Sequence, residues 1–302
     1  MTDMSPRAWL ELLLLALIWG ASFLSIRFAL DEVGPFWVIA WRTTLAALIL
    51  LAVTRAWRIP LPRGWATWGA CLVMGGLNNA IPFGLQAFAM LHVESGLVSI
   101  LNASTAFFGV LIAAAALADE RLTARRLAGV LIGMAGVALA IGPGALATLD
   151  LTSLAQLAVL GSTLSYALAS VWARKRLTHL GPVSAATGML IGGSAITLPL
   201  AVAMEGAPDL SLSATTWAGI AYMVGPATAL AYLLYYRVLA MAGSGNLMLV
   251  TLLVPPVAIT LGALVRAESL TAGDIAGFAL IALGMVVLDG RVMRLLRRAP
   301  AT

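Results

Sequence analysis

One stretch of this chain occurs twice, and that repeat limits the available folds more than any other feature. Residues Glu120–Gly136 read ERLTARRLAGVLIGMAG, and residues Glu268–Gly284, 148 positions later, read ESLTAGDIAGFALIALG. A second set recurs at a spacing of 147, with Arg27, Leu30, Gly34 and Pro35 repeated as Arg174, Leu177, Gly181 and Pro182. A repeat on this scale predicts two copies of one structural unit. We place the copies at residues 1–148 and 149–302.

The composition indicates that both copies lie in a membrane. Of the 302 residues, 61% are hydrophobic and 10% are charged, with a mean hydropathy of +0.99, whereas an average soluble domain is roughly a quarter charged. The net charge of +5 does not indicate nucleic-acid binding, because the basic residues occupy short gaps between apolar runs. Cys71, the single cysteine, lies inside an apolar run, which excludes a disulfide framework and a cysteine metal site. The first apolar run, Leu10–Ile26, lacks a clear cleavage motif and is interpreted as a retained helix.

Apolar runs long enough to cross a bilayer recur along the whole chain. A spanning helix needs roughly 20 apolar residues, each adding about 1.5 Å. On that template we predict an all-α membrane protein with ten segments, five in each copy. They cover residues 8–29, 36–54, 65–90, 95–118, 124–142, 152–173, 183–204, 213–239, 246–265 and 272–290.

The distribution of basic residues predicts how these segments are oriented. Cytoplasmic loops of membrane proteins carry an excess of Lys and Arg. With a cytoplasmic N-terminus, every Lys and Arg falls on the inner side except Arg27 and Arg266, which fall outside, and Arg42, which lies within the second segment. Acidic residues drift outward: Asp31, Glu32, Glu94, Asp150, Glu205, Asp209, Glu268 and Asp274. Both termini are therefore predicted to be cytoplasmic.

An odd number of segments per copy has a structural consequence. The first copy starts inside and the second starts outside, so the two copies are inverted relative to each other in the bilayer. Inverted repeats allow a secondary transporter to open alternately to either side, with its substrate near the bilayer midplane. The alternative is a repeated membrane scaffold that transports nothing.

Short motifs spread over both copies resemble one family. They are WGASF at Trp19–Phe23, Arg42 within AWRTTLAAL, and the two ExLTA segments that begin at Glu120 and Glu268. In this order and spacing the chain resembles the drug/metabolite transporter superfamily, in its ten-helix EamA-type branch. Within that branch it is most similar to the aromatic amino acid exporters of the YddG type.

The resemblance carries expectations about fold and function. It implies a bacterial inner-membrane exporter of neutral and aromatic amino acids that works by alternating access. The first four helices of each copy would surround a central cavity, with the fifth more peripheral. The chain departs from the family pattern in the fourth segment, where a proline expected midway is absent from Asn102–Phe108, whereas the ninth segment has Pro255 and Pro256. This departure leaves the symmetry of the gating movement open.

The sequence contains no pattern that points to covalent chemistry, a metal or a cofactor, so we predict a transporter rather than an enzyme. Polar residues inside apolar segments are costly unless they face the bundle interior, and the third segment holds the richest group. Asn79, Phe83 and Gln86 fall on one helical face, next to Asn78. Pro82 removes the donor for the Asn78 carbonyl and kinks the helix, which is tolerated only inside protein or beside water. The amides are predicted to bind the ammonium and carboxylate of an amino acid; alternatively they bond neighbouring helices.

Further candidates for the cavity wall lie near the middle of other segments. Trp19 and Ser22 share a face of the first segment, and Tyr166 matches Trp19 in the second copy, with Ser162 beside it. Two aromatic rings on opposite walls would pack an apolar side chain, although Trp and Tyr also occupy membrane interfaces. The remaining predicted wall residues are Asn102, Tyr232 and Asn246.

Prolines and glycines give the predicted hinges and helix contacts. The predicted hinges are Pro82, Pro226, Pro255 and Pro256, with static kinks as the alternative. The Gly-x3-Gly pairs that begin at Gly129, Gly188 and Gly273 permit close helix contacts. We assign these pairs to packing within a monomer, with a dimer interface as the alternative.

Charged residues bear on how transport is driven. A proton-coupled exchanger carries an ionisable carboxylate or His deep in the bundle, and Glu11, the carboxylate well inside an apolar run, sits near the inner boundary. We therefore predict facilitated, uniport-like movement, with a proton-coupled drug exporter as the alternative. Glu120 and Glu268 precede helices that the following Thr can cap, and both are interpreted as structural. Arg42 could snorkel, pair with an acidic loop or bind a substrate carboxylate.

Overall fold

A computed structural model describes residues 4–90, 92–93, 95–150, 153–266 and 271–289. Within these ranges every regular element is a helix. Glu94, Glu268 and the arginines that follow residue 290 lie outside the described residues, so the predictions made for them stay predictions.

The first copy contributes the helices from α1 to α7. Their bounds are α1 Pro6–Leu30, α2 Pro35–Ala56, α3 Trp65–Gly75, the π-helix η1 Gly76–Ala80, α4 Ile81–Met90, α5 Ser95–Ala116, α6 Ala124–Ile141 and the short α7 Pro143–Leu146. The second copy contributes α8 Leu154–Arg176, α9 Pro182–Glu205, α10 Ala214–Val224, the π-helix η2 Gly225–Leu230, α11 Ala231–Ala242, α12 Ser244–Met248, α13 Val250–Arg266 and α14 Ala272–Asp289. Each predicted apolar segment falls on one of these helices or on a run of consecutive ones. The four-residue α7 was not predicted.

Six of the described helices or helical runs are long and apolar enough to cross a membrane. They are Pro35–Ala56, Ala124–Ile141, Leu154–Arg176, Pro182–Glu205, Ala214–Ala242 and Ser244–Leu261. The helix boundaries follow from local chemistry. The repeated Gly-Pro pair opens α2 and α9, because the fixed φ of proline suits a first helical turn that lacks N–H partners. Gly206 and Gly243 end α9 and α11 with φ values of 73° and 84°, which favour glycine.

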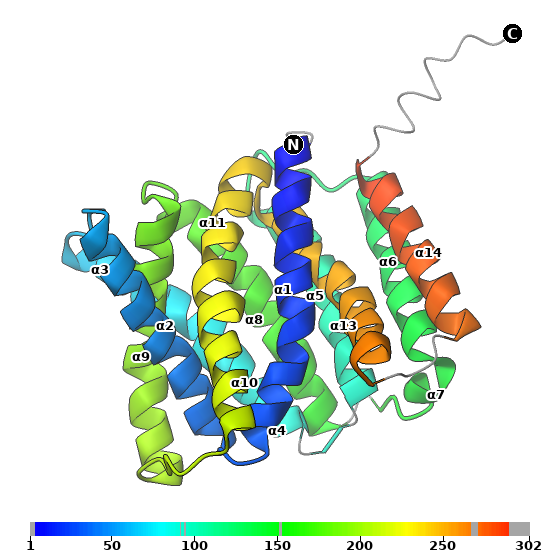
Figure 1. Cartoon of the computed structure of the whole chain (residues 1–302). Coiled ribbons are helices and arrows are strands. Elements are labelled where there is room, and N and C mark those ends of the chain that lie inside the picture. Colours follow the sequence, from blue (N-terminus) through cyan, green and yellow to red (C-terminus); the bar gives the residue numbers. More distant parts are fainter. Residues whose placement is uncertain (1–3, 91, 94, 151–152, 267–270, 290–302) are drawn as a thin grey trace, which may run out of the picture.

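Helices of the two copies alternate through the bundle (Figure 1). α6 lies beside α14 at one edge, and α2 and α3 lie beside α9 at the opposite edge. Between these edges α1 packs against α10 and α13, and α5 packs against α8. Each of these pairs joins a helix of the first copy to one of the second. The main hydrophobic core, which extends along the chain from Met4 to Leu288, is therefore built between the copies.

Glycines set how closely the two copies approach at both edges. A Cβ placed on Gly75 of α3 would lie 2.2 Å from the backbone nitrogen of Gly193 on α9. At the other edge, a Cβ on Gly136 of α6 would lie 2.7 Å from the backbone nitrogen of Ile281 on α14, and one on Gly277 would lie 2.6 Å from backbone of α6. These contacts confirm that the glycines of α6, α9 and α14 pack within one chain.

Two π-helices interrupt the third helix of the first copy and its equivalent in the second. η1 begins at Gly76 and η2 at Gly225, 149 positions later. In η1 the N–H of Ile81 bonds to the carbonyl of Gly76, five residues back instead of four. Pro82 is the second residue of α4, one residue after the end of η1, and Pro226 lies inside η2. The kinks predicted at these prolines are thus π turns, which occur often at functional sites.

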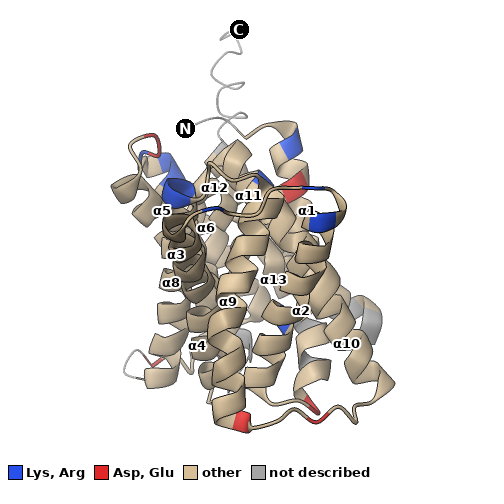
Figure 2. Cartoon of the chain, turned by 90° about the vertical axis from the view of Figure 1, so that its left-hand side faces the viewer, with Lys and Arg blue, Asp and Glu red and all other residues tan. Residues whose placement is uncertain are grey.

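Charged residues gather at the ends of the bundle. Figure 2 shows most of the Lys and Arg positions at the end where α1 begins, whereas Asp and Glu positions lie at both ends. Glu205, at the end of α9, accepts the backbone N–H groups of Phe36 and Trp37 at 3.0 and 3.1 Å, which caps the start of α2. At that end Glu32 accepts from the backbone N–H of Ser213 at 2.8 Å, and the Ser213 hydrogen bonds lower the pKa of Glu32.

Candidate functional site

The two asparagines of η1 form a hydrogen-bonded group with a tyrosine of the other copy. Asn78 donates through Nδ2 to the hydroxyl of Tyr232 on α11 at 3.0 Å, and that hydroxyl donates to Oδ1 of Asn79 at 2.8 Å. Asn78 is also 3.5 Å from the sulfur of Met189 on α9. All three polar residues are buried. The Nδ2 of Asn79 faces Gly193 of α9 and has no acceptor among the described residues.

A second polar group lies further along the same helical run. Gln86 of α4 donates through Nε2 to Oδ1 of Asn102 on α5 at 3.1 Å and to the hydroxyl of Ser162 on α8 at 3.2 Å. Three helices therefore meet at one amide. The Oε1 of Gln86 is engaged by no described donor, and Gln86 and Asn102 are only partly buried, so this amide retains capacity to bind a ligand.

Two separate sets of aromatic rings accompany the polar groups: one includes Tyr232 of the first group, and the other shares α4 and α8 with the second. The ring of Trp19 on α1 meets those of Tyr232 and Tyr235 on α11, with centroids 6.3 and 6.4 Å apart. On the other side Phe83 of α4 meets Tyr166 of α8 edge to face at 6.4 Å. Trp19 and Tyr166, predicted to be equivalent, thus each contact a ring from a helix interrupted by a π turn. Tyr166 and Phe83 are partly exposed.

Each π turn leaves a backbone carbonyl that a side chain of the other copy binds. Because Ile81 bonds to Gly76, the carbonyl of Leu77 loses its α-helical donor, and Pro82 has no N–H to replace it. The hydroxyl of Ser165 on α8 donates to this carbonyl at 2.7 Å. The sequence predicted a free carbonyl at Asn78. The carbonyl that accepts from a side chain is that of Leu77 instead, because the π turn shifts the hydrogen-bond register by one residue.

The equivalent contact in the second copy involves α1. The N–H of Ala231 bonds to the carbonyl of Pro226, five residues back, so the carbonyl of Ala227 loses its α-helical donor. The indole N–H of Trp19 donates to Ala227 at 3.1 Å. Trp19 therefore supports η2 through its nitrogen and presents its ring to the tyrosines of α11.

Arg42 of α2 lies between the two π turns. Its Nε donates to the hydroxyl of Thr228 in η2 at 2.9 Å, and its guanidinium lies over the ring of Phe83, 4.4 Å from the centroid. The residue is only 8% exposed. Thr228 was not among the predicted site residues. The sequence gives one indication of its role: Thr228 lies 149 positions after Asn79, the same spacing that separates the two π turns, so the two polar residues are equivalent in the repeat.

Some predicted residues lie outside this cluster. The hydroxyl of Ser22 donates to the carbonyl of Trp19 in its own helix at 2.7 Å. Asn246, on α12, accepts from Nη2 of Arg126 at 3.1 Å and donates to the carbonyl of Ala242. Pro255 and Pro256 lie inside α13, which is continuous around them.

Charged side chains join helices of the two copies at the end of the bundle where α1 begins. Glu120 is 1% exposed, and its carboxylate accepts the backbone N–H groups of Ser244 and Gly245 at 2.7 and 2.9 Å. Thr123 caps α6, as predicted, by accepting from the N–H of Arg126. The charge of Glu120 therefore supports the start of α12 in the other copy, where the first amides lack helical partners.

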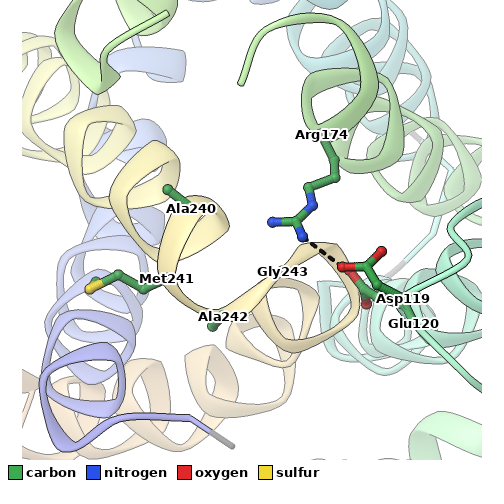
Figure 3. A pocket seen from close by; sticks show the side chains of 7 residues that line it. All are labelled: Asp119, Glu120, Arg174, Ala240, Met241, Ala242 and Gly243. Atoms are coloured by element: carbon green, nitrogen blue, oxygen red, sulfur yellow. Dashed lines mark hydrogen bonds and ion pairs between the residues drawn. The ribbon is translucent and has the colours of Figure 1, made fainter. Parts of the chain in front are cut away.

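A cavity of about 420 Å³ opens beside Glu120. Figure 3 shows Arg174 of α8 reaching across it toward Asp119, with the turn at Ala242 and Gly243 beneath. The two charged groups are 2.7 Å apart, and Asp119 is largely exposed.

Glu11 lies at the same end and is held by two arginines. Its Oε1 is 3.1 Å from Nε of Arg7 and 2.5 Å from Nη2 of Arg237 on α11, while its Oε2 has no partner among the described residues. The carboxylate side chain is 7% exposed. In the described parts of the chain, no three His, Cys, Asp or Glu side chains are grouped so as to hold a metal ion.

Comparisons with known proteins agree with this architecture. The profile of the EamA-like transporter family matches residues 7–142 and again residues 153–288. A Salmonella typhimurium protein named "Probable amino-acid metabolite efflux pump" is 25% identical over 291 residues, covering 91% of this chain and 92% of its own length. An Escherichia coli protein of the same name is 25% identical over 295 residues, covering 94% and 95%. A solved crystal structure superposes with a TM-score of 0.78 at 20% identity, covering 98% of this chain and all of the other, which shows a shared fold.

Proposed function

Because the chain belongs to the EamA-like transporter family, we propose that it exports neutral and aromatic amino acids across a bacterial inner membrane. Two relatives bear the name amino-acid metabolite efflux pump, which supports this substrate class at low identity. The working unit is a monomer of ten spanning segments, arranged as two inverted copies with both termini in the cytoplasm. The two matches of the family profile and the concentration of basic residues at one end of the bundle support this arrangement.

The observation that carries the substrate proposal is the mixture of amide and aromatic side chains on and around α4 and α8. An amino acid needs hydrogen-bond partners for its ammonium and carboxylate and an apolar surface for its side chain. Gln86, with a free oxygen and two polar neighbours, supplies the first. The partly exposed ring of Phe83, beside Tyr166, supplies the second. A polar side chain with unused hydrogen-bonding capacity inside a membrane bundle is costly to keep unless it binds a ligand.

Alternating access follows from where the chain can bend. The two π turns lie in equivalent helices, and each has lost regular backbone bonds that side chains now replace. Movement at η1 and η2 would open the cluster to one side of the membrane at a time. Pro255 and Pro256 in α13 are further candidates for such bending. The contacts of Glu120 and Glu11 join helices of the two copies at the end that we assign to the cytoplasm, and they would have to break or move for that end to open.

We propose facilitated movement down the amino-acid gradient. Glu11 is the buried carboxylate that would serve a proton-coupled mechanism, and in this structure it is held by Arg7 and Arg237. It also lies at the end of the bundle, away from Gln86 and Phe83. These positions favour a structural role for Glu11, and they leave the amino-acid cluster without an acid of its own among the described residues.

The test is counterflow into liposomes that contain the purified protein. Labelled phenylalanine, methionine and threonine are offered with and without an imposed pH gradient. Uptake that ignores the gradient supports an amino-acid facilitator. Uptake that requires the gradient supports the proton-coupled alternative. No uptake by folded protein contradicts the proposed substrates and favours a membrane scaffold that transports nothing. Gln86→Ala should reduce uptake at least tenfold, whereas Thr178→Ala, at an exposed position just after α8, should leave it unchanged.

A further inference from the structure

Arg42 is a buried cation without a carboxylate partner among the described residues. The ion pairs of the described chain join Glu11 to Arg7 and Arg237, and Asp119 to Arg174. Arg42 takes part in none of them, although it is only 8% exposed. It is therefore neither snorkelling to the surface nor paired with an acidic loop in this structure. A buried charge in a membrane bundle is costly unless an opposite charge or strong hydrogen bonds compensate it.

The contacts of Arg42 hold the side chain in one direction. Thr228 donates its own proton to the carbonyl of Met223 at 2.7 Å, so its oxygen is free to accept from Nε of Arg42 at 2.9 Å. Phe83 covers one face of the guanidinium at 4.4 Å. One nitrogen and one face are thus occupied by the protein.

The two terminal nitrogens of Arg42 remain available. Neither Nη1 nor Nη2 donates to a described residue, and neither is sealed from solvent, unlike Nδ2 of Asn79. Together these nitrogens present the pair of parallel N–H groups that binds a carboxylate through two hydrogen bonds. The fork is held by η2 and by a ring that also contacts Tyr166, so the available charge lies beside the aromatic part of the cluster.

We propose that Arg42 binds the carboxylate of the transported molecule, and that a free carboxylate is therefore required of every substrate. This inference rests on the proposed function and sharpens it to amino acids and related monocarboxylates. Phe83 would contact both the guanidinium and the apolar part of the ligand. Amino-acid amides and aromatic amines, which lack the anion, would be excluded by the uncompensated positive charge. The requirement separates this protein from an exporter of cationic drugs.

The experiment uses four probes that share a phenyl ring and differ in charge. Phenylalanine and 3-phenylpropionate carry a carboxylate, whereas phenylalaninamide and phenethylamine do not. Binding is followed by the shift in thermal unfolding midpoint of the purified protein in detergent. We expect both carboxylates to raise the midpoint of the unmodified protein and both carboxylate-free probes to leave it unchanged. This comparison needs no variant, so it does not depend on whether a substituted protein folds.

Variants then test whether Arg42 is the residue that recognises the carboxylate. Arg42→Gln should weaken phenylalanine binding at least tenfold, and Arg42→Lys, which keeps the charge but loses the fork, should weaken it less. Arg176→Gln, at the end of α8, is the control and should bind as the unmodified protein does. Binding of phenylalanine to Arg42→Gln within twofold of normal would overturn the inference, as would equal binding of phenylalaninamide and phenylalanine.

The test of the carboxylate requirement can fail without the test of amino-acid export failing, and the reverse also holds. If no carboxylate probe shifts the midpoint, carboxylate recognition by Arg42 is wrong, while counterflow of labelled amino acids still supports or contradicts amino-acid transport by itself. If counterflow occurs with phenylalaninamide as readily as with phenylalanine, the export proposal stands and the carboxylate requirement fails.

Discussion

The indole nitrogen of Trp19 lies 3.1 Å from the carbonyl oxygen of Ala227, and this contact ties the first helix of one copy to the π turn of the other. The contact between Ser165 and Leu77 does the same in the opposite direction. The two donors differ chemically, an indole in one copy and a hydroxyl in the other. Both copies share one structural requirement. A π turn with a proline in it or near it leaves a buried backbone carbonyl without a backbone donor, and a side chain of a neighbouring helix donates to that carbonyl.

Loss of the Ser165 donor should destabilise the protein. Ser165→Ala leaves the Leu77 carbonyl without its side-chain donor, which costs roughly 1–3 kcal/mol for a buried polar group. Ser184→Ala is the matched control, because the buried Ser184 hydroxyl has no partner among the described residues. The measurement is the thermal midpoint in detergent. Equal midpoints for the two variants would contradict the role assigned to Ser165.

The hydroxyl of Tyr232 should matter more than that of Tyr235. Tyr232→Phe removes the group that links Asn78 to Asn79 and leaves two buried amides short of a partner. Interhelical hydrogen bonds in membranes are worth about 0.6 kcal/mol each on average, so a lowered midpoint is expected. Tyr235→Phe removes a buried hydroxyl that no described residue bonds, and should be neutral or stabilising. The reverse order in thermal unfolding would show that the hydrogen bonds are wrongly placed.

The crossing of α3 and α9 should tolerate no side chain at Gly75. Gly75→Ala places a Cβ 2.2 Å from the backbone of Gly193, so the helices must separate at a cost of roughly 1–3 kcal/mol or more. Gly69→Ala, two turns earlier on α3, meets nothing within 4 Å and should be silent or slightly stabilising. Yield of monodisperse protein after membrane extraction distinguishes them, and a Gly75→Ala protein as abundant as Gly69→Ala would contradict the packing described.

The carboxylate of Glu120 should be needed in its charged form. Glu120→Gln offers one acceptor oxygen to the two N–H groups of Ser244 and Gly245 and turns an N–H donor toward the other. A hydrogen bond to a charged group is worth roughly 1.5–3 kcal/mol, so the thermal midpoint should fall. Asp119→Asn breaks a neighbouring but exposed pair with Arg174, for which about 0–1 kcal/mol is expected. If both substitutions lowered the thermal midpoint by similar amounts, the burial of Glu120 would not explain its contribution to stability.

Transport should not depend on protonation of Glu11. Glu11→Gln keeps the shape of the side chain and one acceptor for the arginines, but it cannot carry a proton. We expect counterflow of phenylalanine within about threefold of normal, because the proposed binding residues, Gln86 and Phe83, are not in contact with Glu11. The assay is repeated with a pH gradient. Folded Glu11→Gln protein that has lost transport entirely would count against facilitated movement and favour the proton-coupled alternative.

The helices could be predicted from sequence because hydropathy and glycine patterns act locally. The apolar segments coincide with helices, and the glycines of α6 and α14 pack as their spacing indicated. Candidate site residues such as Gln86, Asn102 and Ser162, chosen from three separate segments, meet at one amide because polar residues within apolar helices must find one another or a ligand.

The remainder depends on partners far away in the chain. The π turns could not be read from Pro82 and Pro226, since a proline predicts a lost N–H but not the shift in register that neighbouring side chains stabilise. The partner of Glu120 lies 124 residues further on, at Ser244. Thr228 was missed because a lone threonine in an apolar run usually bonds its own helix, and it does so here while also accepting from Arg42.

The glycine contact between α6 and α14 bears on how the chain is made. α6 ends at Ile141, and α14 begins only at Ala272. At a synthesis rate of roughly 5–20 residues per second, the glycine face of α6 waits on the order of ten seconds in the bilayer before its partner emerges. During that interval Gly129 and Gly136 lack the α14 backbone that they contact in the folded chain. The contact at this edge therefore forms only after α14 has been made, on a surface of α6 that was made near the middle of the 302 residues, and a ribosome stalled before Ala272 would leave that surface open to other membrane proteins.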